Sequence, residues 1–169
     1  CLAYFPSLEQ LDQFDRLLYG RLADIPNEPD KFGYQVVVDE QEMILENPEK
    51  LLISAVDMGL EQLEEKVHEL GGLFVPAHID RMRNGIIAQL GFVPPALKCD
   101  ALEVSPHSSP PELIRQYSYL KDYAFLRGSD AHYPDDIGLG RTRFYLAELS
   151  WEEISLAMKG IGERKMELI

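Results

Sequence analysis

Hydrophobic residues recur with the period of an α-helix in five stretches of the chain. The predicted helices span residues 8–22, 58–70, 84–90, 110–120 and 151–158. Ser7, followed by Gln10, is typical of a capping box at the start of the first helix, and Ser150 with Glu153 predicts the same for the last. Asp57 is expected to cap the second helix. These local signals predict where helices begin, but not how they pack.

Short apolar runs lie between the predicted helices. They predict buried strands at residues 73–77, 100–104, 123–126 and 143–146. The valine-rich residues 34–39 form a further candidate strand, which residues 43–45 could pair with, inside an irregular surface insertion or flap over residues 26–57. Strands that alternate with helices are typical of α/β proteins, so the pattern predicts a parallel sheet or barrel.

Composition narrows the class of protein. The chain has 169 residues, 46% hydrophobic and 27% charged, as expected for one globular domain with a real core. It has no apolar run of about 18 residues and no targeting segment, so we expect a cytoplasmic location and no membrane partner. Cys1 and Cys99 form no disulfide pattern. The net charge of -13 makes extended nucleic acid an improbable partner, yet a small phosphorylated substrate held through metal ions stays compatible with it.

Titratable side chains gather where three of the predicted strands end. His78 and Asp80 follow the first of these strands, Glu103 lies near the end of the second, and Asp130 and His132 follow the third. The carboxyl ends of parallel strands meet at one edge, so these groups are expected to come together. Imidazoles and carboxylates without thiolates favour Zn, Mn or Fe in an open catalytic site.

Each of these residues also has a plainer interpretation. His78 alone is typical of a hydrogen-bonded structural histidine, and Asp130 of a helix N-cap. Glu103 would face solvent on an alternating strand. His68 is predicted to be a surface residue of an acidic helix, and His107 lies in a loop as a weaker site candidate.

Three segments together resemble the later motifs of the PHP superfamily (polymerase and histidinol phosphatase domain). They are Gly-Gly-Leu-Phe-Val-Pro-Ala-His-Ile-Asp at residues 71–80, Ala-Leu-Glu-Val-Ser at 101–105 and Gly-Ser-Asp-Ala-His at 128–132. Their order and separation are most similar to those of bacterial PHP metal-dependent phosphoesterases. The resemblance implies a distorted (β/α)7 TIM-like barrel with a trinuclear metal site, and hydrolysis of a phosphate ester by metal-activated water.

The resemblance carries over to individual residues. It implies that His78, Asp130 and His132 are metal ligands. Asp80 and Glu103 have no matching role, and we expect them to orient the ligands through hydrogen bonds. Three arginines beside these loops are candidates for binding a substrate phosphate, with solvent-facing loop charge as the plainer alternative: Arg81, Arg83 and Arg141.

The chain departs from the PHP pattern at its start. It lacks the initial His-x-His motif, and its four histidines all lie at or beyond position 68. We therefore expect residues 1–169 to be the C-terminal portion of a single PHP domain. Such a portion would hold an incomplete set of ligands for up to three Mn, Zn or Fe ions, and would be inactive or weak alone. It would expose a barrel edge through which it could form a homo-oligomer.

Two other functions stay open at this point. One is a PHP-like binding or regulatory module without catalysis, which would lack metal at His78, Asp130 and His132. The other is a PHP nuclease acting on nucleic-acid ends, which would carry lysines and arginines beside the metal-binding face.

Overall fold

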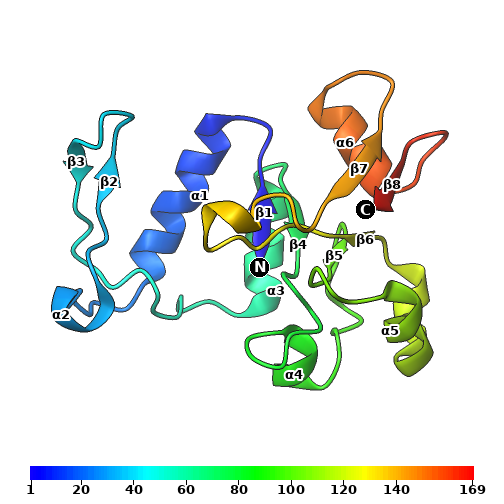
Figure 1. The fold of residues 1–169 in the computed structure, drawn as a ribbon, viewed down its shortest axis with the longest axis horizontal. Coiled ribbons are helices and arrows are strands. Elements are labelled where there is room, and N and C mark those ends of the chain that lie inside the picture. The colour runs from blue at the N-terminus through cyan, green and yellow to red at the C-terminus, as the bar shows by residue number, and fades with distance from the viewer.

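The computed structural model describes residues 1–169 as a mixed α/β chain (Figure 1). Its α-helices are α1 (Leu8–Arg21), α2 (Pro29–Phe32), α3 (Leu60–Glu69), α4 (Ile86–Leu90), α5 (Pro110–Gln116) and α6 (Trp151–Met158). Its strands are β1 (Leu2–Tyr4), β2 (Val37–Val38), β3 (Ile44–Glu46), β4 (Leu73–Val75), β5 (Leu102–Glu103), β6 (Phe125–Leu126), β7 (Thr142–Tyr145) and β8 (Lys165–Leu168). No helix is both long enough and apolar enough to cross a membrane.

Four short strands lie side by side at the centre of the molecule. β1 pairs with β4 antiparallel, and β5 pairs with β6 parallel. Backbone hydrogen bonds connect the two pairs: the Asp100 amide donates to the Phe74 carbonyl at 2.9 Å, and the Glu103 amide donates to the Pro76 carbonyl at 3.0 Å. β4, β5 and β6 therefore direct their carboxyl ends, and the loops that follow, to one region.

The predicted (β/α)7 barrel is wrong for this chain. The strands form four two-stranded sheets, and β5–β6 is the one parallel pair. β7 corresponds to the strand predicted at residues 143–146. It pairs antiparallel with β8, which the sequence does not predict. A strand-helix-strand order indicates parallel neighbouring strands only when both strands belong to one sheet. The strands here have two to four residues, which leaves little backbone to form the hydrogen bonds of one continuous sheet.

The core is built on both faces of β4. All three of its residues are buried, and successive side chains point to opposite faces. Leu73 and Val75 pack with Leu126 in one hydrophobic cluster, whereas Phe74 packs with Phe14 of α1 in another. β4 thus joins helix α1 to the strands that lead into the candidate site.

Most helices lie where the sequence predicts them, but α4 begins two residues later than predicted, at Ile86, and α5 ends at Gln116 and not near residue 120. α1 and α6 begin as predicted, and the Ser150 hydroxyl accepts the Glu153 amide at 3.2 Å. Ser7 forms no such cap, because its hydroxyl donates to the side chain of Gln10 instead. The predicted Asp57 cap is also wrong: α3 begins two residues later than expected, at Leu60, after Gly59 as N-cap.

The predicted excursion over residues 26–57 contains a β-hairpin at one end of the molecule (Figure 1). β2 and β3 pair antiparallel, which confirms the pairing of residues 34–39 with 43–45, and every residue of both strands is exposed. The turn is held by Asp39, whose Oδ1 accepts the amides of Gln41 at 3.0 Å and Met43 at 2.8 Å.

Candidate functional site

His78 lies in the loop that leaves β4. Its backbone is left-handed, with φ of 30°, and its amide donates to Glu103 Oε2 at 3.0 Å. Its ring Nδ1 is buried and has no hydrogen-bond partner. A buried imidazole nitrogen without a partner is costly unless something else binds it, so this atom is a candidate ligand position.

Asp80 connects the loop after β4 to the loop after β5. Its carboxylate accepts the Ser105 amide at 2.9 Å and the hydroxyls of Ser105 and Ser108. Burial opposes ionisation of Asp80, but these hydrogen bonds outweigh it and hold its pKa below the ordinary value. Its oxygens are therefore engaged in fixing loop geometry.

Glu103 is the buried acid of the site, with 6% of its surface exposed. It lies at the end of β5, close to the His78 amide and to Gly128, where an added Cβ would lie 2.8 Å from Glu103 Oε1. Burial, and after it the negative charge of Glu103, raises the pKa of the Tyr4 phenol in β1. Glu103 thus holds the loops after β4 and β6 close to one carboxylate, and does not face solvent.

Asp130 and His132 lie in the loop after β6. Asp130 is left-handed, with φ of 49°, and its Oδ2 pairs with Arg81 Nη1 at 2.7 Å. His132 Nε2 lies 3.9 Å from Asp130 Oδ1, and its side chain is 71% exposed. Arg83 is exposed and makes no ion pair. Arg81 and Asp130 therefore form an ion pair, although the sequence predicts Arg81 as a phosphate-binding residue and Asp130 as a metal ligand.

No three histidine, cysteine, aspartate or glutamate side chains come together in an arrangement that could hold a metal ion. The expected ligands instead form two parts: His78 beside Glu103, and His132 beside Asp130. His107 is exposed in the loop after β5. The donor types in both parts, imidazole nitrogen and carboxylate oxygen, are those that divalent cations prefer, and Nδ1 of His78 has no hydrogen-bond partner, but the two parts do not form one ligand set.

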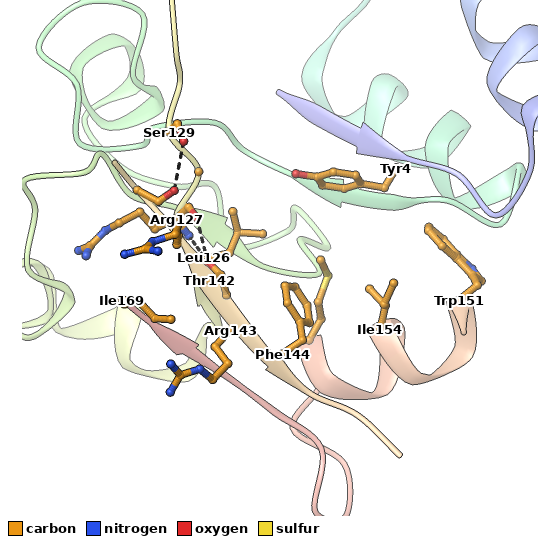
Figure 2. A pocket seen from close by; sticks show the side chains of 14 residues that line it. Tyr4, Leu126, Arg127, Ser129, Thr142, Arg143, Phe144, Trp151, Ile154 and Ile169 are labelled. Atoms are coloured by element: carbon orange, nitrogen blue, oxygen red, sulfur yellow. Dashed lines mark hydrogen bonds between the residues drawn. The ribbon is translucent and has the colours of Figure 1, made fainter. Parts of the chain in front are cut away.

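A cavity of about 700 Å³ adjoins the loop that carries Asp130 (Figure 2). Its apolar wall is formed by residues from β6, β7 and α6, among them Leu126, Phe144, Trp151 and Ile154. Tyr4 from β1 faces the same space (Figure 2).

Arginines line the polar side of the cavity. Arg127, Arg141 and Arg143 all contribute to it. The Arg127 amide donates to Thr142 Oγ1 at 2.7 Å, and the same hydroxyl donates back to the Arg127 carbonyl at 2.9 Å. Of these three residues, the sequence predicts only Arg141 as a phosphate-binding candidate. The position of Arg127 directly before the Gly-Ser-Asp segment could have indicated that it lies near the site, whereas Arg143 has no such signal.

No protein-family model matches this chain. The chain is 28% identical over 170 residues to the uncharacterized protein YqxK of Bacillus subtilis (strain 168), covering 98% of this chain and 38% of that protein.

Two solved structures share its fold. The lesion-specific endonuclease PfuEndoQ from Pyrococcus furiosus matches 97% of this chain with a TM-score of 0.72 at 22% identity. Endonuclease Q in complex with a 27-mer duplex substrate with an abasic lesion at the active site matches 96% with a TM-score of 0.70 at 21% identity. This chain spans 36% of each of those chains.

Proposed function

We propose that this chain forms part of a metal-dependent nuclease of the PHP type that hydrolyses phosphodiester bonds in DNA. The observation that carries the proposal is the match of 97% of the chain to a lesion-specific endonuclease with a TM-score of 0.72. Among the functions considered from the sequence, it favours the nuclease over a phosphoesterase of small substrates and over a non-catalytic module.

The residues that would contribute ligands for a divalent cation such as Mn, Zn or Fe are His78 in one part of the site and Asp130 with His132 in the other. Their donor atoms suit such a cation, but the two parts do not converge on one position within this chain. A bound cation would activate a water molecule and stabilise negative charge on the phosphoryl oxygens. Glu103 would fix the His78 loop through the amide hydrogen bond of 3.0 Å.

The local charge near the site supports a phosphodiester substrate despite the net charge of -13. Arg127, Arg141 and Arg143 line the cavity beside the Asp130 loop; Arg127 also donates to the Ser108 carbonyl and Arg143 pairs with Glu167, whereas Arg141 makes no ion pair. Guanidinium groups suit bidentate contacts with phosphate, and aromatic side chains such as Trp151 offer a surface on which a base can stack. The sequence-wide charge therefore underestimates how well this face suits a nucleic-acid strand.

The test is strand cleavage with Mn²⁺ by the purified full-length protein that contains this chain. Labelled DNA duplexes with and without one abasic site are incubated with the wild type and with His78→Ala and Asp130→Asn variants. Loss of a metal ligand is expected to reduce cleavage by about 100-fold or more, because the metal contributes several kcal/mol to the reaction. His107→Ala is the matched control, since His107 is an exposed loop histidine outside the proposed ligand set.

Other outcomes would point elsewhere. Hydrolysis of p-nitrophenyl phosphate without DNA cleavage would identify a phosphoesterase of small substrates. Absence of Mn²⁺-dependent hydrolysis of either substrate by the full-length protein would support a non-catalytic module. Equal loss in His107→Ala and His78→Ala would contradict the ligand assignment.

A further inference from the structure

Arg127 is fixed in position through both its backbone and its side chain. Its amide donates to Thr142 Oγ1 at 2.7 Å, and its carbonyl accepts the same hydroxyl at 2.9 Å. Its Nη2 donates to the carbonyl of Ser108, in the loop after β5. Ser108 is held in turn, because its hydroxyl donates to the carboxylate of Asp80. The Arg127 guanidinium is therefore tied to the loops that follow β4 and β5.

No carboxylate of the chain pairs with the Arg127 guanidinium. Arg81, Arg143 and Arg164 each lie close to a carboxylate oxygen, at 2.7, 3.5 and 2.8 Å, whereas Arg127 forms no ion pair. Its Nε is buried and has no hydrogen-bond partner. A charged donor that is removed from water without a partner is costly, so such a group is expected where an anion binds.

The surroundings of Arg127 indicate which kind of anion can reach it. Arg127 lines the cavity of about 700 Å³ at the opposite end from Trp151 (Figure 2). Arg141 lines the same cavity. Guanidinium groups are planar forks of N–H donors, which match the geometry of phosphate oxygens. This end of the cavity therefore suits a phosphate group.

We propose that Arg127 is the anchor for one backbone phosphate of the bound DNA strand, and that Ser108 holds it in position. The inference rests on the proposed function, because the DNA strand is the source of the phosphate. Arg143 differs from Arg127 in that its guanidinium already pairs with Glu167 at 3.5 Å and its side chain is 55% exposed. Arg127 is the guanidinium of this cavity that is both fixed in position and free of a carboxylate.

The experiment measures binding of a labelled DNA duplex with one abasic site by fluorescence anisotropy. It uses the full-length protein that contains this chain, in EDTA so that the duplex stays intact, over a series of NaCl concentrations. The logarithm of the affinity falls with the logarithm of the salt concentration, with a slope set by the number of phosphates that the protein neutralises. Arg127→Gln is expected to reduce this slope by about 1 and to weaken binding at low salt about tenfold.

Arg143→Gln is the matched control, because it removes the same charge from the same cavity. Since Arg143 already shares its charge with Glu167, its replacement is expected to change the affinity by about twofold or less.

Two further variants separate contact with the phosphate from a structural role. Arg127→Lys keeps the charge but not the planar fork, so it should retain the slope of the wild type and bind more weakly. Ser108→Ala removes the hydroxyl that donates to Asp80 and leaves the charge of Arg127 in place. It is expected to weaken binding about threefold with an unchanged slope, because the guanidinium is less well ordered.

The outcomes separate this inference from the proposed function. No binding of the duplex by the wild type, or equal affinities and slopes for Arg127→Gln and Arg143→Gln, would overturn the phosphate anchor. Weaker binding by Arg127→Gln with the slope of the wild type would identify a structural role and would also overturn it. Absence of Mn²⁺-dependent DNA cleavage by the wild type would overturn the proposed function, whatever the binding data.

Discussion

His68 connects helix α3 to the residue that leads into β5, and its replacement tests how much this contact stabilises the fold. Its Nδ1 lies 2.6 Å from Glu64 Oε1, and its Nε2 lies 2.8 Å from Asp100 Oδ2. The ring therefore lies between two carboxylates and contacts both. Those two side chains are 10% and 11% exposed, so without His68 they would face each other with little solvent.

We expect His68→Ala to lower the free energy of unfolding by about 2–3 kcal/mol. Removal of one partner that leaves a buried hydrogen-bonding group unsatisfied costs about 1–3 kcal/mol, and more where the remaining group is charged. His68 is 30% exposed, so water partly screens the two remaining carboxylates and reduces the cost. For a chain of this size each kcal/mol corresponds to about 2–4 °C, so Tm should fall by about 4–12 °C.

The assay is thermal and urea denaturation followed by circular dichroism. Lys66→Ala is the control on the same helix, because its ion pair with Glu69 joins side chains that are 41% and 51% exposed. That variant should change stability by no more than about 0.5 kcal/mol. If His68→Ala and Lys66→Ala had the same small effect, His68 would be the surface residue that the sequence predicted, and the reasoning from the two contacts would be refuted.

Three further predictions concern other parts of the fold. Hydrogen bonds from Arg164 lower the pKa of Glu153, so the stability that its carboxylate adds is full above about pH 4.5 and is lost as pH falls through the lowered pKa. The Tm difference between wild type and Glu153→Gln should therefore shrink as the pH is lowered below about 4.5, and a constant difference would contradict this. Burial raises the pKa of the Cys99 thiol to about 12, so at neutral pH Cys99 should react with thiol reagents far more slowly than the exposed Cys1. Equal reaction rates of the two cysteines would contradict this. Gly85→Ala should destabilise the protein by about 1–3 kcal/mol in urea denaturation, because the alanine Cβ would lie 2.4 Å from the Arg81 carbonyl oxygen. An unchanged denaturation midpoint would show that the turn around Arg81 can relax to accommodate the methyl group.

Local signals in the sequence were sufficient for most helices and for the central strands. The spacing of apolar residues placed α1 and α6, and the apolar run at residues 73–77 contained β4. Strand partners were not predictable in this way. Residues 165–168 pair antiparallel with β7, and β1 pairs antiparallel with β4, although the chain pattern indicated parallel neighbours. Partner choice depends on contacts between distant residues, which periodicity does not report.

The candidate site was predicted in outline from the ends of the strands. The proximity of His78 and Glu103 followed from that position, and their hydrogen bond of 3.0 Å shows the two loops in contact. The ion pair of Arg81 with Asp130 could not be predicted, because it depends on left-handed backbone at His78 and Asp130, which non-glycine residues adopt only in particular loops.

The prediction that His68 is a surface residue missed its two contacts for a related reason. Its neighbours in sequence are acidic, so the helix face resembled one in contact with solvent. Asp100, distant in sequence, closes over the imidazole at 2.8 Å. Burial of a polar side chain by a distant segment leaves no local signal.

Asp80 has a consequence for how a ligand would bind near His78. Its bonds to Ser105 and Ser108 restrict two loops that would otherwise sample many conformations. The conformational entropy of these loops is therefore lost when the protein folds, before any ligand arrives. A ligand that binds at this edge meets a preorganised surface, so more of its interaction energy contributes to affinity and less is offset by ordering of the loops.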